Sequence, residues 1–170
     1  VLRQAGVTVV LDVGGHRGQF GSRMRHMGFR GQIVSFEPGP DVAALHVVAS
    51  DDGNWRVVEA ACGARPGRLQ LNVMRGTDFN SLHQPDPAQA SRFRSMEVVR
   101  TREVDVVRID DVASSIVRAG DTVLLKSDTQ GHDLEVLNGA ERLWPQIAGV
   151  LVEASVVPLY SDQPVIEDTI

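Results

Sequence analysis

The segment VVLDVGGHRG (residues 9–18) decides the fold of this chain. Its apolar, β-branched first half is typical of a parallel strand that is covered on both faces. Gly14 allows a tight turn in which a ligand can approach the backbone closely. Gly18 lets the following helix pack near the strand. The segment therefore predicts a strand, a glycine turn and a helix beside a ligand site.

Strands and helices alternate along the rest of the chain. Amphipathic helical patterns separate further apolar runs, which predict strands at residues 33–36, 55–58, 122–125 and 150–152. Residues 77–95 predict a long loop, and such loops in domains of this size are usually functional or mobile. The alternation predicts an α/β fold with a doubly wound, mostly parallel, Rossmann-like sheet. Ligands of such sheets bind beyond the carboxyl ends of the strands. We expect one domain over residues 1–170.

Composition excludes several classes of function. The chain has 170 residues and a formal net charge of −5, which argues against a protein that binds nucleic acid by neutralising phosphates. Cys62 is the only cysteine, so no intrachain disulfide forms and a reducing, cytoplasmic location is expected. No apolar run approaches the roughly 20 residues of a membrane helix. No P-loop, nucleophile-elbow or zinc-protease motif is present.

Asp12 and Glu37 indicate an adenosine-containing ligand. The spacing D-x-G-x-x-x-G differs from the G-x-G-x-x-G of dinucleotide sites, and Asp12 would repel a pyrophosphate. A carboxylate suits the positive groups of S-adenosylmethionine, to which it is attracted by about 1–4 kcal/mol at 4 Å. The alternative is that Asp12 caps a helix or accepts a backbone hydrogen bond. Glu37 ends the second predicted strand, where a carboxylate can accept hydrogen bonds from both ribose hydroxyls.

Five sequence blocks carry a more specific resemblance. They are DVG (residues 12–14), GQF (18–20), FEP (36–38), LLKSDTQG (124–131) and EVLNGA (135–140). In this order the chain resembles the FkbM family of methyltransferases. The resemblance implies a class I methyltransferase fold, with a seven-stranded sheet whose last strand is reversed. It also implies methyl transfer from S-adenosylmethionine to a hydroxyl oxygen of a sugar, glycolipid or secondary metabolite.

The resemblance also implies roles for individual residues. Glu37 with Pro38 should hold the ribose, Ala60 and Ala61 should flank the adenine, and Asp128 should lie beside the transferred methyl group. The methionine half of the cofactor should contact Asp12, Gly14, Gly15, His16 and Gly18. Gly15-His16 departs from the small or amide residues that are commoner there, so His16 either alters the cofactor contacts or has no role.

A hydroxyl acceptor needs a group that takes its proton, and the sequence offers several. Asp128 and His132 flank the glycine turn at the binding edge and are the main candidates for the catalytic base. The alternatives are that Asp128 binds the cofactor and that His132 is a surface residue at a helix start. His83, near the polar Asn80-Ser81 segment, is a further candidate, and these three residues are assigned to the acceptor site. Lys126, the only lysine, is either a buried partner of a carboxylate or a functional group.

The sequence also supports two further expectations and leaves two rival functions open. A class I sheet needs two strands after residues 150–152, so we expect C-terminal strands beyond Ile170. No carboxylate cluster suggests a divalent metal, and we expect metal-independent transfer. One rival is an NAD-dependent oxidoreductase, which would bind NAD rather than S-adenosylmethionine. The other is a noncatalytic cofactor-binding scaffold, which would not turn S-adenosylmethionine over.

Overall fold

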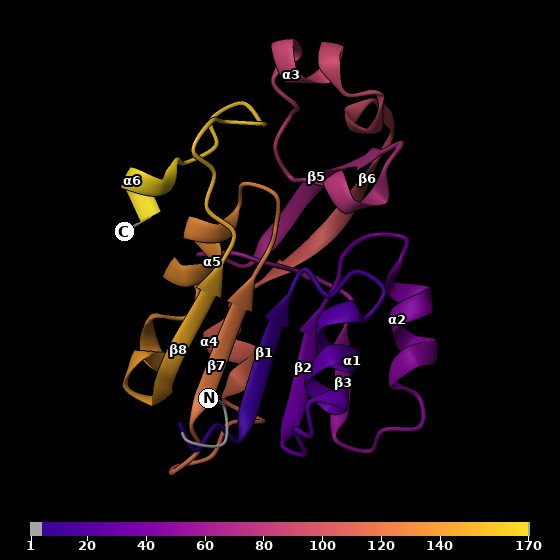
Figure 1. Ribbon diagram of the computed structural model, residues 1–170. Coiled ribbons are helices and arrows are strands. Elements are labelled where there is room, and N and C mark those ends of the chain that lie inside the picture. Colours follow the sequence, from indigo (N-terminus) through magenta and orange to yellow (C-terminus); the bar gives the residue numbers. More distant parts are fainter. Residues whose placement is uncertain (1–4, 170) are drawn as a thin grey trace.

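A five-stranded sheet lies at the centre of the computed structural model, which describes residues 5–169 (Figure 1). The strand order is β3-β2-β1-β7-β8, and every neighbouring pair is parallel. This confirms the predicted α/β class and the Rossmann-like parallel sheet. The reversed last strand of a class I sheet is not among residues 5–169, where β8 forms one edge. The strands are β1 (Val9–Val13), β2 (Gln32–Phe36), β3 (Trp55–Val58), β7 (Val123–Ser127) and β8 (Ile147–Val152).

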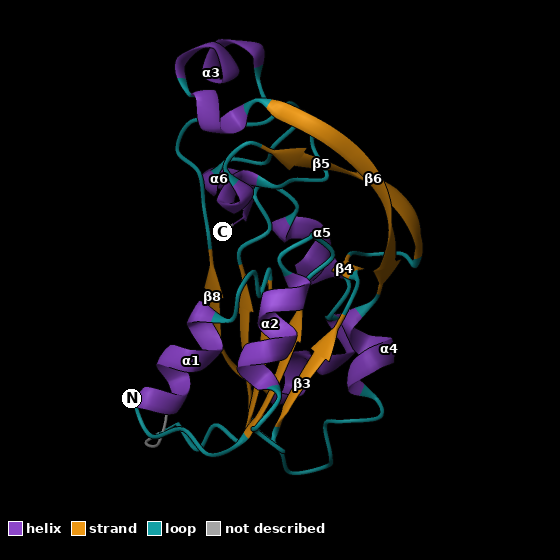
Figure 2. Cartoon of the chain, turned by 90° about the vertical axis from the view of Figure 1, so that its right-hand side faces the viewer, coloured by secondary structure: helices purple, strands orange, loops and turns teal. Residues whose placement is uncertain are grey.

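Helices cover both faces of this sheet (Figure 2). Side chains alternate along a strand, so Val9, Leu11 and Val13 enter one core cluster while Val10 enters another. The cluster around Val10 is covered by α1 (Gln19–His26) and α2 (Val42–Ala49). The opposite cluster is covered by α4 (Ile109–Ala113), α5 (Asp133–Asn138) and the 3₁₀ helix η3 (Glu141–Gln146).

A second, three-stranded sheet extends past the carboxyl ends of the central strands (Figure 1). Its strands β5 (Gly67–Met74) and β6 (Val98–Val107) are antiparallel, and the short β4 (Ala61–Cys62) pairs with β6. The connection between β5 and β6 contains η1 (Thr77–Phe79), α3 (Pro87–Arg92) and η2 (Arg94–Met96). Residues 77–95 do form a long connection between two strands, as predicted, but three short helices interrupt it.

The start of α3 shows how one of these helices begins. The Asp86 carboxylate accepts hydrogen bonds from the backbone N–H groups of Ala88 and Gln89, at 2.9 and 3.2 Å. Pro87 occupies the first turn, where its missing N–H is no loss. An N-cap acid before a proline is a readable helix start, and it was overlooked.

The chain returns to this second sheet after β8. Tyr160 is buried with Met74 and Met96 and pairs with Pro85 through an isolated β-bridge. The last described helix is α6 (Ile166–Thr169). Across the described part of the chain, no helix has the length and apolar character needed to cross a membrane.

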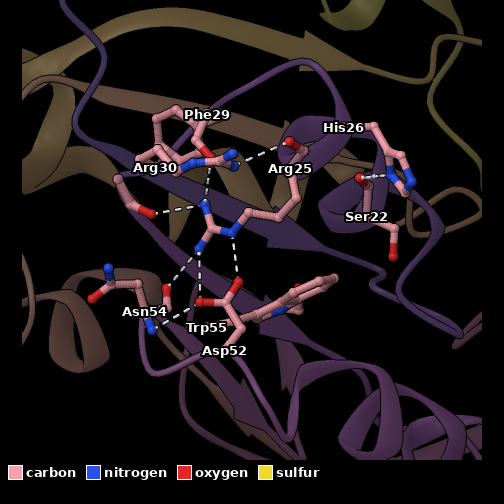
Figure 3. Close-up of polar contacts among 10 residues, drawn as sticks. Ser22, Arg25, His26, Phe29, Arg30, Asp52, Asn54 and Trp55 are labelled. Carbon is pink, nitrogen blue, oxygen red and sulfur yellow. Dashed lines mark hydrogen bonds and ion pairs between the residues drawn. The ribbon is translucent and has the colours of Figure 1, made fainter.

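Arg25 of α1 ties together the loops at the amino-terminal ends of β2 and β3 (Figure 3). Its guanidinium forms an ion pair with Asp52 and donates hydrogen bonds to the carbonyl oxygens of Phe29, Gly31 and Asn54. These partners lie in the loops that lead into β2 and β3. The network therefore fixes the amino-terminal edge of the sheet and leaves the carboxyl edge for the site.

Candidate active site

A cavity of about 460 Å³ lies at the carboxyl ends of β1, β2 and β7. Its size is within the roughly 300–1,000 Å³ of small-molecule sites. After β1 the chain continues to β2 and β3 on one side of β1, and β7 and β8 lie on its other side. Open parallel sheets bind ligands at such a reversal of the strand order. The predicted site residues that line it are Gly14, Gly15, His16, Glu37, Pro38, Ala60, Ala61, Asn80, Ser81, Asp128 and His132.

The turn after β1 packs directly against the turn after β7. Gly14 has φ of 75°, and a Cβ added there would lie 1.9 Å from the carbonyl oxygen of Asp128. The Asp128 N–H donates to the Val13 carbonyl oxygen at 3.1 Å, which holds the two turns together. Only glycine fits at position 14, so bare backbone forms this part of the cavity wall.

Gly18 is not in the cavity wall, in contrast to the predicted cofactor contact. Its φ is 85°, and an added Cβ would lie 3.1 Å from Leu45 and 3.4 Å from Trp55. Gly18 therefore allows α1 to pack closely beside α2 and β3. This is the packing role that its place in the glycine turn suggested.

Asp12 also lies behind the wall rather than in it. Its side chain is fully buried, because alternation along β1 turns it toward the face that α1 and α2 cover. One carboxylate oxygen lies 3.1 Å from Lys126 Nζ, and the other accepts a hydrogen bond from Ser35 Oγ at 2.9 Å. Ser35 in turn accepts one from Trp55 Nε1 at 3.0 Å. The expected direct contact of Asp12 with the cofactor is thus replaced by a contact with Lys126.

Lys126 connects this buried carboxylate to the cavity. Its ammonium group donates to the carbonyl oxygens of Val13 and Gly14, at 3.1 and 2.8 Å, in addition to its ion pair with Asp12. Its side chain also lines the cavity and lies over the Phe20 ring, 5.8 Å from its centroid. The predicted pairing with a carboxylate is confirmed. The lysine fixes the path of the glycine turn.

Glu37 is held at the end of β2 with its carboxylate in the wall. One oxygen accepts the N–H of His16 at 2.8 Å, and the other accepts the N–H of Gly39 at 2.6 Å. Burial raises the pKa of Glu37, and these two hydrogen bonds partly offset the rise. Each oxygen keeps a lone pair for a further donor.

His16 joins the first turn to the segment that covers the cavity. Its Nε2 lies 3.0 Å from Thr77 Oγ1 and 3.1 Å from Asp41 Oδ2. Its Nδ1 lies 3.0 Å from the side-chain amide of Gln19. The sequence left open whether His16 has a role, and these contacts give it the role of attaching η1 to the turn after β1.

The polar Asn80-Ser81 pair organises the opposite wall. Asn80 Oδ1 accepts the N–H of Met74 at 2.9 Å, which ties the segment to β5. Ser81 Oγ donates to the carbonyl oxygen of Gln130 at 2.6 Å and so holds the turn after β7. Both residues line the cavity. Their contacts provide a structural reason for the polar segment, which the sequence alone did not supply.

Comparison with known protein families identifies the family of this chain. The family model described as "Methyltransferase FkbM domain" matches residues 12–170. The chain belongs to this family. It is therefore a methyltransferase domain, and the resemblance seen in the sequence blocks is confirmed. No curated protein and no solved structure gives a significant match.

His83 and His132, the two histidines that the sequence proposed for the acceptor site or as the base, form a pair. His83 Nε2 lies 3.2 Å from His132 Nδ1. Of these two histidines, only His132 lines the cavity. Burial, together with the neighbouring His83, lowers the pKa of His132 to about 4. Burial also lowers the pKa of His83. The predicted acceptor residue His83 therefore stands behind His132 instead of facing the cavity.

Sequence reasoning missed Glu153, which directly follows β8. Its Oε2 accepts a hydrogen bond from Gln130 Nε2 at 2.7 Å, and the same nitrogen donates to Asp128 Oδ1 at 3.0 Å. The readable signal was an acid immediately after an apolar strand, the pattern that singled out Glu37. Glu153 and Asp128 thus stand side by side at the ends of neighbouring strands.

No metal site accompanies these residues in the part of the chain that the structure describes. Between residues 5 and 169, no group of three or more His, Cys, Asp or Glu side chains is arranged to hold an ion.

Proposed function

We propose that this FkbM methyltransferase domain uses S-adenosylmethionine and methylates a hydroxyl oxygen. The observation that carries the proposal is the Glu37 carboxylate in the cavity wall, at the end of the strand beside β1. A carboxylate in this place of a Rossmann-like sheet accepts hydrogen bonds from ribose hydroxyls. The N–H groups of His16 and Gly39 hold it in position for this task.

Other parts of the wall suit the rest of the cofactor. Ala60 and Ala61 supply a small apolar surface for the adenine at the end of β3. The bare backbone of Gly14 and Gly15 leaves room for the methionine half. Asp128 places a carboxylate where a sulfonium cation would be attracted. When bound, the cofactor would supply an electrophilic methyl group.

The acceptor is proposed to be a small molecule or glycolipid with a free hydroxyl group, as the family resemblance implies. Transfer is an in-line displacement, so the protein must align the acceptor oxygen and exclude water. Ser81 and Asn80 lie in the wall opposite the glycine turn and are proposed to border the acceptor. A cytoplasmic site of action remains a prediction, supported by the single, buried thiol of Cys62.

The test is a calorimetric titration of S-adenosylmethionine and S-adenosylhomocysteine into the protein and into Glu37→Ala. We expect micromolar binding to the wild type and at least tenfold weaker binding to the variant, about 1.4 kcal/mol or more. Glu141→Ala is the matched control, because this exposed acid in η3 does not line the cavity. It should bind both ligands as the wild type does.

Three results would contradict the proposal. Equal binding by the wild type and Glu37→Ala would remove Glu37 from the cofactor site. Binding of NAD, with no binding of either sulfur compound by the folded protein, would support the oxidoreductase instead. Binding of S-adenosylmethionine without turnover of any hydroxylated acceptor would favour the noncatalytic scaffold.

A further inference from the structure

Two carboxylate side chains leave the same edge of the sheet from adjacent strands. Asp128 follows β7 and Glu153 follows β8, and these strands pair in parallel with Ser127 opposite Val152. The Glu153 N–H donates to the Ser127 carbonyl oxygen at 3.1 Å, so the pairing continues to the bases of both side chains. Asp128 lines the cavity, Glu153 does not, and both residues are exposed to solvent. The two carboxyl groups therefore lie where the cavity opens to solvent.

Gln130 bridges the two carboxyl groups and is itself held in place. Its Nε2 donates one N–H to Asp128 Oδ1 and the other to Glu153 Oε2, at 3.0 and 2.7 Å. Its Oε1 lies 3.0 Å from the hydroxyl group of Tyr160, which also lies 2.9 Å from the Phe79 carbonyl oxygen. The single hydroxyl hydrogen of Tyr160 can be donated to only one of these two oxygens at a time, and the NH2 end of the amide faces the acids because carboxylate oxygens accept hydrogen bonds. Gln130 adopts φ of 56°, a left-handed conformation that is uncommon for a residue with a side chain.

The charges around Glu153 explain how readily it takes up a proton. Partial burial raises the pKa of Glu153 to about 7, and the negative charge and hydrogen bond of Asp128 add to the rise. Asp133 acts in the same direction, and the positive charge of Lys126 opposes it. The neighbouring Tyr160 stays neutral, because burial and the two acids raise its pKa. The pair of carboxyl groups thus exchanges one proton near neutral pH.

We propose that Asp128 and Glu153 form a proton-accepting pair for the acceptor hydroxyl. Asp128, which faces the cavity, takes the proton as the catalytic residue. Glu153 acts through Asp128 as a positioning residue that receives the proton and releases it to solvent. The inference rests on the proposed function, since it concerns methyl transfer to oxygen. The acceptor is the neutral hydroxyl group of the proposed function, whose proton must leave during the transfer.

The transfer of one methyl group breaks two bonds and forms two. The acceptor O–H bond breaks and its proton goes to Asp128, while the acceptor oxygen forms a bond to the methyl carbon. The carbon–sulfur bond breaks, its electron pair remains on sulfur, and the sulfonium becomes a neutral thioether. The protonated pair then returns its proton to water through Glu153.

His132, the other candidate base, is less suited to this step. A pKa near 4 makes it a weak base at neutral pH, and its Nδ1 already contacts His83. A group that titrates near the working pH is the better proton acceptor. The carboxyl pair meets this condition, and it also has contact with solvent for the return of the proton.

The first measurement uses the positive charge of S-adenosylmethionine to test whether the two carboxyl groups release a proton when the ligand binds. Calorimetry of S-adenosylmethionine and S-adenosylhomocysteine binding, in buffers of different ionisation enthalpy, counts the protons that binding releases. A positive sulfonium close to the pair should lower its pKa by at least one unit, so S-adenosylmethionine should release roughly half a proton at pH 7. Its affinity should rise about tenfold between pH 6 and pH 8. S-adenosylhomocysteine has no sulfonium charge and should show neither effect.

The variants separate the pair from the cofactor site. Glu153→Gln should bind both ligands but lose the proton release specific to S-adenosylmethionine, and Glu141→Gln should behave as the wild type. Carbon-13 NMR of labelled carboxyl groups gives a second, ligand-free readout. One carboxyl should titrate near pH 7 in the wild type, and none should do so in Glu153→Gln.

The outcomes distinguish this inference from the proposed function. If S-adenosylmethionine does not bind while a carboxyl still titrates near pH 7, the proposed function fails and the catalytic role of the pair fails with it. If S-adenosylmethionine binds but the Glu153→Gln protein releases as many protons as the wild type, the inference alone is overturned. The absence of any carboxyl that titrates near pH 7 would overturn it equally.

Discussion

Two pairs of ionisable residues stand on neighbouring strands of this sheet, and they are built in opposite ways. Asp12 and Lys126 pair across β1 and β7, with opposite charges, and both are buried. Asp128 and Glu153 follow β7 and β8, carry like charges and meet at the cavity mouth. The first pair has its charges compensated, whereas the two acids of the second pair are bridged by the Gln130 amide.

The comparison suggests a structural role for the Asp12–Lys126 pair and a chemical role for the Asp128–Glu153 pair. A buried opposite-charge pair keeps both groups ionised and fixes backbone geometry, here the carbonyl oxygens of Val13 and Gly14. A like-charge pair resists ionisation, so it exchanges a proton near the working pH, as catalytic groups often do. The two pairs are joined through Gly14, whose backbone contacts Lys126 on one side and Asp128 on the other.

The largest expected effect comes from breaking the first pair. Lys126→Met leaves the Asp12 carboxylate buried without its counter-charge, and the free energy of unfolding should fall by about 3–5 kcal/mol. Urea denaturation measures this loss. The double variant Asp12→Asn/Lys126→Met is the matched control, because a neutral amide at position 12 needs no cation and still accepts from Ser35. It should recover most of the stability, and a double variant as unstable as Lys126→Met would show that charge pairing is not the cause.

A smaller effect is expected where the two pairs meet. Gly14→Ala would force a Cβ against the Asp128 carbonyl oxygen, and its φ of 75° adds strain of about 1–2 kcal/mol. Gly120→Ala is the control, since φ there is 94° and no atom lies within 4 Å of the added Cβ. Gly14→Ala should be less stable than this control by about 1–3 kcal/mol of overpacking. Equal losses in the two variants would mean that the turns after β1 and β7 can move apart freely.

Much of the fold and of the cavity wall could be predicted, for a physical reason. Parallel strands that are covered on both faces read as nearly continuous apolar runs, and the central strands were visible as such runs. Glu37 and Asp128 were recognisable because polar residues directly after buried strands all meet at one edge. Glu153 follows the same rule, because it comes directly after the apolar residues of β8.

The position of Asp12 could not be predicted in the same way. Alternation along β1 placed it on the face opposite Val9 and Leu11, yet which face borders the cavity depends on where α1 and Lys126 lie. The partnership of Asp12 with Lys126 joins residues 114 positions apart, and no local pattern specifies such a contact. The role of Ser81, which holds Gln130, was hidden for the same reason.

The smallest expected effect is on the pH dependence of stability, whose sign tests the contrast between the two pairs of ionisable residues. In the folded protein the pKa of Glu153 is about 7, above the roughly 4.3 of an unfolded glutamate. Between these values the folded state holds a proton that the unfolded state has lost, so the wild type loses stability as pH rises toward 7. Glu153→Gln should remove this loss.

Thermal unfolding of the wild type and Glu153→Gln at pH 5 and pH 8 tests the sign. The variant should gain relative to the wild type at pH 8 by less than about 1 kcal/mol, since solvent screens the repulsion, and it should gain less at pH 5. Lys126→Met should show no such gain at pH 8, because it leaves the buried Asp12 carboxyl group without its counter-charge. If Glu153→Gln and the wild type change in parallel between the two pH values, the like-charge pair exerts no net repulsion, and the contrast with Asp12 and Lys126 disappears.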